Sequence, residues 1–146
     1  MLRGSAPAKI DDKGRLKIPT DFRRLVEERY GQDLFVTSVV GDSALVYPLP
    51  VWEEIEQKLA ALPSTDRTKV RYLERVNYFG QQVTLDVQGR IVIPQLLRES
   101  AGMNGDVVVS GQVNHLVIWN HERFAKRLED QPFTDEDFRA LSLAGI

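Results

Sequence analysis

Cysteine is absent from this chain of 146 residues. The chain therefore forms neither a disulfide nor a thiolate metal site, and a reducing compartment suits it. No run of eighteen apolar residues occurs, which argues against a transmembrane helix. The first residues, MLRGSAPAKIDDKGR, also lack the apolar segment of a secretory signal. We therefore expect a soluble, cytoplasmic protein with no membrane partner.

Histidine is scarce as well. The only two, His115 and His121, lie six residues apart in the second half of the chain, a spacing that suits no common metal site. With no cysteine to add to them, we expect no metal ion and no cofactor.

A large excess of charge of one sign is also missing, since the net charge is −2. The ends of the chain nevertheless differ. Residues 1–24 carry seven basic and three acidic side chains, whereas residues 129–137 carry five acidic side chains and no basic one. Such asymmetry is compatible with a polyanion-facing surface near the N-terminus, although ordinary solvated faces are the commoner explanation of charge alone.

The sequence does contain an internal repeat. DDKGRLKIPTDFRR at 11–24 returns as DVQGRIVIPQLLRE at 86–99. Aligning 8–24 with 83–99 gives six identities in seventeen positions, where ordinary composition would give roughly one. The identical pairs are Asp11/Asp86, Gly14/Gly89, Arg15/Arg90, Ile18/Ile93, Pro19/Pro94 and Arg23/Arg98. We predict a first repeat at 1–62, a connecting helix at 63–80, a second repeat at 81–129 and an acidic C-terminal tail or helix at 130–146.

One repeat shows the pattern strand, turn, strand, helix, strand, strand. Ala8 to Asp11 predicts a short strand, Gly14 a tight turn, and the alternation around Leu16 and Ile18 a half-buried strand. Thr20 then fits the N-cap of a helix. Two such repeats predict an α+β fold of short antiparallel strands, in which the two halves interleave into one β-barrel with approximate two-fold symmetry and with both turns on one side.

Apolar stripes at helical spacing are expected to face the core. They comprise Phe22, Leu25, Val26 and Tyr30 in the first helix, Trp52, Ile55, Leu59 and Leu62 in the second, and Val70, Leu73 and Val76 in the third.

The repeated Asp-x-x-Gly-Arg phrase has a chemistry of its own. With Gly14 at the turn, Asp11 and Arg15 lie on opposite arms of a tight hairpin, where the carboxylate can accept turn amides or fix the guanidinium. The planar fork of arginine suits the O6/N7 edge of guanine or a phosphate. A surface arginine that only braces the hairpin remains the alternative, but the duplication favours paired contacts with a nucleic acid.

An enzyme is a weaker interpretation. Asp11 and Asp86 suggest the paired carboxylates of aspartic proteases, but neither is followed by the small Thr/Ser-Gly of such a dyad. An arginine four residues later would keep each carboxylate ionised. We expect no catalytic residues.

These motifs together resemble the MraZ family of bacterial transcriptional regulators. The likeness rests on the MLRG start, both Asp-x-x-x-Arg motifs, the segment YPLPVWEEIEQKL and the Ile-Trp end of the second repeat. The resemblance implies an α+β fold in which two AbrB-like repeats interleave into one pseudo-two-fold swapped-hairpin β-barrel with flanking helices. It also implies assembly into ring-shaped homo-oligomers. It further implies binding to short G-rich direct repeats in its own promoter, ahead of the division and cell-wall gene cluster, and hence association with the nucleoid.

The family's DNA-contacting motif falls on Asp11 to Arg15 and on Asp86 to Arg90. By this resemblance Arg15 and Arg90 contact bases and Lys13 contacts phosphate, with Gln88 as the polar counterpart of Lys13. The positioning residues are Asp11, Gly14, Asp86 and Gly89. Because the second turn carries less positive charge, we expect the first to contribute more. Peripheral candidates are Arg3, Lys17 and Lys69, whereas Arg23 and Arg98 fit helix-side salt bridges better.

The remaining alternative is an AbrB-type assembly or antitoxin-like module whose main target is a protein partner. The tail FTDEDFRALSLAGI, with Phe133, Phe138 and Leu141, is compatible with a docking peptide. A terminal helix packed on its neighbour is the simpler expectation.

Overall fold

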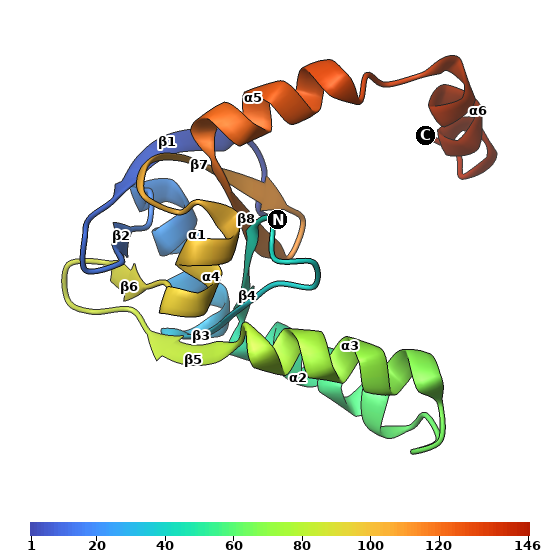
Figure 1. Cartoon of the computed structure of the whole chain (residues 1–146), viewed down its shortest axis with the longest axis horizontal. Coiled ribbons are helices and arrows are strands. Elements are labelled where there is room, and N and C mark those ends of the chain that lie inside the picture. The colour runs from blue at the N-terminus through green and yellow to red at the C-terminus, as the bar shows by residue number, and fades with distance from the viewer.

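A computed structural model describes all 146 residues. It contains eight strands and six helices (Figure 1). Their bounds are β1 Ser5–Ile10, β2 Arg15–Lys17, α1 Thr20–Tyr30, β3 Asp33–Thr37, β4 Ala44–Pro48, α2 Leu49–Ala60, α3 Arg67–Tyr78, β5 Gln81–Thr84, β6 Arg90–Val92, α4 Gln95–Ala101, β7 Gly105–Gln112, β8 His115–Asn120, α5 His121–Asp130 and α6 Asp135–Leu143. The element order of β1 to α2 returns in β5 to α5, with α3 between the two series. The domain limits at 62/63, 80/81 and 129/130 stay a prediction.

The strands form one antiparallel sheet in the order β5-β3-β4-β8-β7-β1-β2-β6. Its two end strands are consecutive in the chain, and the Asp86 N–H donates to the Arg90 carbonyl (3.0 Å) at the turn between them. The sheet is therefore a nearly closed barrel. Four pairings cross between repeats, namely β1 with β7, β5 with β3, β2 with β6 and β4 with β8. The predicted α+β swapped-hairpin barrel is confirmed.

The two repeats meet symmetrically at β2 and β6. Leu16 pairs with Ile91 in the middle of the ladder. Beyond its ends the Ile18 N–H donates to the Gly89 carbonyl (2.9 Å), and the Ile93 N–H donates to the Gly14 carbonyl (2.8 Å). Each repeat thus gives the other the same bond.

The core follows from the alternation of the sequence. Leu16 and Ile91 are 0% and 2% exposed, while Lys17 and Val92 beside them face outward. Twenty buried side chains from both repeats form this core. A second, small cluster joins Tyr47, Val51 and Trp52 to Val76 of α3, so the connecting helix is anchored to the barrel by its C-terminal half.

Several local expectations are wrong. Thr20 is the first residue of α1 and does not cap it; the N-cap is Pro19, whose φ of −51° leads the chain directly into the helix. The first strand begins at Ser5 because the pairing with β7 extends that far. The stripes are buried only in part, since Leu25, Leu62 and Val70 are 43%, 42% and 41% exposed.

The C-terminal helices leave the barrel. Figure 1 shows α5 running off its edge and α6 standing clear of it, so the expected packing of a terminal helix on its neighbour is wrong for this chain. Every residue from 125 to 146 is exposed. None of the six helices combines the length and the apolar character needed to cross a membrane.

Candidate nucleic-acid interface

The first turn is built around the Asp11 carboxylate. Its Oδ1 accepts the N–H groups of Lys13 (3.0 Å) and Arg15 (2.8 Å), and its Oδ2 accepts Nε–H of Arg15 (2.7 Å). Gly14 adopts a φ of +80°, which a residue with a Cβ rarely adopts, and its N–H donates to the Asp11 carbonyl (2.9 Å). One aspartate therefore holds both the turn backbone and the direction of the guanidinium.

The second turn repeats this geometry. Asp86 Oδ1 accepts from Gln88 N–H and Arg90 N–H, both at 2.8 Å, and Oδ2 accepts from Arg90 Nε–H at 3.0 Å. Gly89 has a φ of +75°. The difference between the turns lies at their exposed tips, where Lys13 stands in one and Gln88 in the other.

Hydrogen bonds from the turns favour the ionised form of both carboxylates. The backbone N–H of Arg15, followed by its side chain, lowers the pKa of Asp11 below the usual value for aspartate. The backbone N–H of Arg90 is likewise the main cause of the lowered pKa of Asp86. Each carboxylate is committed to its own turn, so the two do not form a proton-sharing pair.

The arginines keep their outer edge free. In Arg15 and Arg90 the aspartate occupies only Nε, and neither guanidinium donates its terminal NH₂ groups to another residue of the chain. Both side chains are part-exposed, at 40% and 33%. Two planar donor pairs are thereby oriented and available for an external acceptor.

The outward face of the β2–β6 ribbon gathers these groups. Arg15 lies opposite Val92, and Lys17 lies opposite Arg90. All four positions alternate with the buried Leu16 and Ile91, so they face the same way. The two turns flank this ribbon and lie on one side of the molecule (Figure 1). Lys17, a peripheral candidate in the sequence, thus joins Arg15 and Arg90 on the outward face of this ribbon.

Other candidates lie elsewhere. Arg3 sits beyond the end of β1 that is remote from the first turn, next to the bridge between Leu2 and Val113. Lys69 belongs to α3, which projects from the opposite side of the barrel (Figure 1). Neither joins the group around the turns.

Arg23 and Arg98 support the turns across the repeats. Arg23 Nε forms the expected ion pair with Glu27 (3.1 Å), and its Nη2 donates to the Val87 carbonyl in the second turn (3.3 Å). Arg98 forms no salt bridge, contrary to expectation, because Gly102 occupies the position corresponding to Glu27.

Arg98 instead donates from Nε to the Ile93 carbonyl (3.0 Å) and from Nη1 to the Asp12 carbonyl in the first turn (3.5 Å). The recurrence of these two arginines is visible in the sequence, but their role is not. The turn that each one supports lies in the other repeat. The recurrence itself was the only available signal.

Comparison with known proteins agrees with the duplicated architecture. A family model described as "MraZ protein, putative antitoxin-like" matches residues 1–75 and again 80–143. The protein named transcriptional regulator MraZ from Acidobacterium capsulatum is 49% identical over 146 residues, with both chains covered completely. Its namesake from Koribacter versatilis is 48% identical over 147 residues, again with complete coverage of both. The namesake from Thioalkalivibrio sulfidiphilus is 41% identical over 139 residues, 94% of this chain and 91% of the relative.

These relatives define a class of transcription regulators and not of enzymes. The chain belongs to the MraZ family.

Proposed function

We propose that this protein is a sequence-specific DNA-binding regulator of transcription. Its target is a set of short G-rich direct repeats in its own promoter, ahead of the division and cell-wall gene cluster, which it binds on the nucleoid as a ring-shaped homo-oligomer. The observation that carries the proposal is the pair of guanidinium groups on one outward ribbon, each held from behind by an aspartate and open in front.

The ribbon matches the chemistry of a major groove. A two-stranded β-ribbon fits this groove, which is about 12 Å wide. The free edges of Arg15 and Arg90 suit the O6 and N7 atoms of guanine, which agrees with G-rich sites. We expect Lys13 and Gln88, which lie at the turn tips, to contact the flanking phosphates.

Charge alone does not hold the complex together. The chain carries a net charge of −2, so non-specific attraction to DNA is weak. Affinity then depends on several chains engaging several repeats at once. A ring of subunits meets this requirement because closed symmetry fixes the spacing between the ribbons.

Electrophoretic mobility shifts with a promoter fragment test the proposal. Arg15→Ala and Arg90→Ala should each cost about 1–3 kcal/mol per bound site and relax the preference for G-rich sequence. Arg71→Ala, on α3 and remote from the ribbon, is the matched control and should bind normally. If affinity is unchanged and only the melting temperature falls, Arg15 is a hairpin brace and the proposed function is wrong.

The exposed α6 favours a second candidate, an antitoxin-like module directed at a protein. Phe133 and Phe138 are 58% and 61% exposed on a segment without a packing partner. Copurification of a toxin-sized protein at fixed stoichiometry, together with only non-specific binding of duplex DNA, would favour this candidate over promoter recognition.

A further inference from the structure

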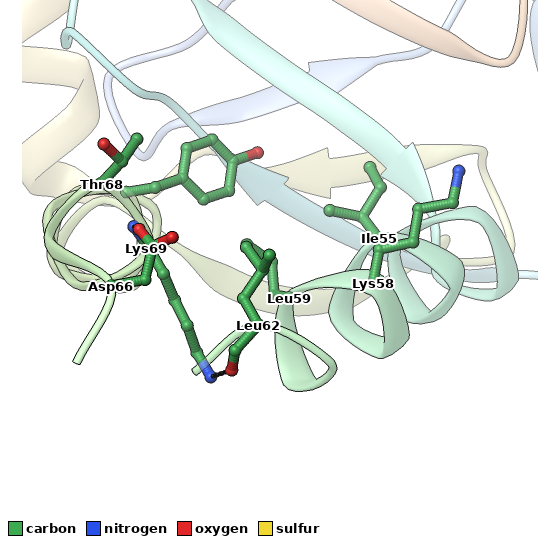
Figure 2. Close-up of a pocket in the computed structure, with 8 residues that line it drawn as sticks. Ile55, Lys58, Leu59, Leu62, Asp66, Thr68 and Lys69 are labelled. Atoms are coloured by element: carbon green, nitrogen blue, oxygen red, sulfur yellow. Dashed lines mark hydrogen bonds between the residues drawn. The ribbon is translucent and has the colours of Figure 1, made fainter. Parts of the chain in front are cut away.

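An apolar groove lies between α2 and α3, away from the two turns. Its volume is about 460 Å³. Its apolar lining consists of Ile55, Leu59, Leu62 and Tyr72. Figure 2 shows Ile55, Lys58 and Leu59 together on α2, across the opening from α3. Lys69 reaches over from α3 and donates from Nζ to the Leu62 carbonyl (2.8 Å). The groove therefore combines an aliphatic and aromatic floor with ammonium groups at its edges.

The helix α6 carries a complementary surface. Its N-terminus is fixed by a capping box, in which Thr134 Oγ1 accepts from Asp137 N–H (3.2 Å) and Asp137 Oδ2 accepts from Thr134 N–H (2.9 Å). Phe138 packs edge-on against Phe133 with ring centroids 4.8 Å apart. Phe138 and Leu141 lie one turn apart on the same side of the helix, and both are exposed.

This helix needs a partner to persist. It has nine residues, and isolated helices shorter than about 12–15 residues are marginal in water. None of its residues is buried. A well-capped helix with aromatic side chains in water is the usual form of a segment that folds against another surface.

The charges of the two surfaces are opposite. The first turn of α6 is Asp135, Glu136 and Asp137, and Glu129 and Asp130 precede it. The groove edge carries Lys58 and Lys69 against a single acid, Asp66, which is engaged in capping α3 through the Lys69 N–H (2.9 Å). Helix α3 has four basic side chains and one acidic one. Helix α2 has three acidic side chains besides Lys58, namely Glu53, Glu54 and Glu56, but none of them lines the groove. An acidic, apolar helix is thus the occupant that the groove favours.

The groove of the same chain is out of reach. Figure 1 shows α5 leaving the barrel at its upper edge and carrying α6 away from it, whereas the α2–α3 pair extends from the lower edge. Helix α5 is tied to the barrel by the stacked rings of Trp119 and Phe124 and by the bond from Arg123 to the Ser100 carbonyl (3.2 Å). Only residues 131–134 connect α5 to α6, and four residues span at most about 14 Å. The helix can fill such a groove only on another copy.

We propose that α6 of one chain docks in the α2–α3 groove of a second copy. Phe138 and Leu141 cover the floor, and the acidic first turn of the helix faces Lys58 and Lys69. This interface is heterologous, with donor and acceptor on different surfaces of each subunit, so it repeats around a ring or along an open chain. The inference rests on the homo-oligomer of the proposed function and supplies its interface.

A single contact of this kind is small. One phenylalanine buries about 150–250 Å², so one docked helix falls short of the roughly 1,200 Å² of a standard stable interface. Ring closure raises the effective concentration of each later contact and stabilises the whole assembly. Assembly should therefore be cooperative and weaken sharply on dilution.

Sedimentation velocity of the full-length chain tests the interface from both sides. The arm variant Phe138→Asp/Leu141→Asp should sediment as a monomer at concentrations where the wild type is oligomeric. The groove variant Lys58→Glu/Lys69→Glu should do the same. The milder Lys58→Glu, whose side chain has no partner within the chain, should shift the dissociation midpoint at least several-fold. In the arm variant, which is named for α6 as the docking arm, both substituted side chains are exposed. Its melting temperature should therefore differ little from that of the wild type.

Mixing the two variants gives the sharper result. The arm variant keeps an intact groove and the groove variant keeps an intact arm, so an equimolar mixture can form a dimer and nothing larger. Because that dimer is held by one contact without ring closure, it should appear only at concentrations well above those at which the wild type assembles. Adding Asp135→Lys/Glu136→Lys to the groove variant reverses the charge on both surfaces and should restore the oligomer. A mixture that assembles beyond the dimer, an arm variant with wild-type mass, or a wild type that is monomeric throughout would each overturn the interface.

The same proteins separate this inference from the proposed function. Arg15→Ala should keep the oligomer and lose promoter binding. If the wild type assembles through α6 but binds DNA without specificity, the proposed function is wrong and the interface stands. If DNA is bound specifically while the arm variant retains its mass, the interface is wrong and the proposed function stands.

Discussion

The guanidinium of Arg98, on α4 of the second repeat, lies against Gly14 in the turn of the first repeat. A Cβ added at Gly14 would be 2.6 Å from Cζ of Arg98. Arg23 lies against Gly89 in the same way, at 2.6 Å from its Cδ. Each turn is therefore supported by an arginine of the other repeat, which ties the geometry of one turn to the folding of both halves.

Replacing Gly14 by alanine should destabilise the protein through two effects. A left-handed backbone costs an alanine about 1–2 kcal/mol, and displacing Arg98 loses its bond to Asp12, worth about 0.5–1.5 kcal/mol. Urea unfolding measures the sum. Gly105→Ala is the control, because Gly105 has a φ of +70° with nothing within 4 Å of an added Cβ. Equal losses in the two variants would show that Arg98 contributes nothing.

Acid should loosen both turns. The folded pKa of Asp11 and Asp86 is lowered by the N–H groups they accept, so their stabilisation is complete above the ordinary aspartate pKa of about 4 and is lost as pH falls through the lowered value. The stability difference between wild type and Asp11→Asn should therefore be constant at neutral pH and shrink in acid. Urea unfolding between pH 2 and 7 measures this difference, and Asp12→Asn, which removes a neighbouring carboxylate without hydrogen bonds, is the control for the loss of one negative charge.

The two turn tips should contribute unequally to salt dependence. If Lys13 contacts a phosphate, Lys13→Gln removes about one released counterion per bound site and flattens the slope of log affinity against log salt by about 0.9. Gln88→Lys should steepen it by a similar amount. The double exchange Lys13→Gln/Gln88→Lys keeps the charge and is the control for position. A slope unaffected by Lys13→Gln would place that side chain away from the DNA.

The barrel was predictable because its signals are periodic. Alternation around Leu16 and Ile91 identifies half-buried strands. Because a two-stranded unit is only marginally stable alone, the duplication indicates that the two halves complete one barrel together. The aspartate–arginine pairs were predictable because they are local. In each pair the two residues are only four positions apart in the chain.

Contacts between distant segments left no comparable signal. Nothing near Arg98 in the chain indicates that it supports Asp12 and Gly14, because those residues are 86 and 84 positions away. The amphipathic pattern of α6 likewise shows that the helix has an apolar side, but not which surface covers it. For Thr20, the fixed φ of Pro19 prevailed over the capping preference of threonine.

Thr37 should matter because it fastens α3 to the barrel. Its buried Oγ1 donates to the Val76 carbonyl at 2.6 Å, near the C-terminal end of that helix. Thr37→Val has a similar shape but leaves the carbonyl without this donor in a buried place, which costs about 1–3 kcal/mol. Thr37→Ser keeps the hydroxyl and loses only a methyl group, about 1 kcal/mol. Urea unfolding of the pair should rank valine below serine, and the reverse order would show that packing dominates.

Promoter affinity should depend on the spacing of the repeats more than on any one of them. The ribbon offers two guanidinium groups per chain. In the proposed ring, successive ribbons would be held at fixed intervals, so only correctly spaced repeats would be bound together. Inserting half a helical turn, about 5 base pairs, between otherwise intact repeats should weaken binding by at least tenfold in a mobility shift. Inserting a full turn restores the rotational phase and should recover part of that loss. A monomeric variant that bound a single repeat as tightly as the wild type binds the array would contradict the multivalent mechanism, because each ribbon would then suffice by itself.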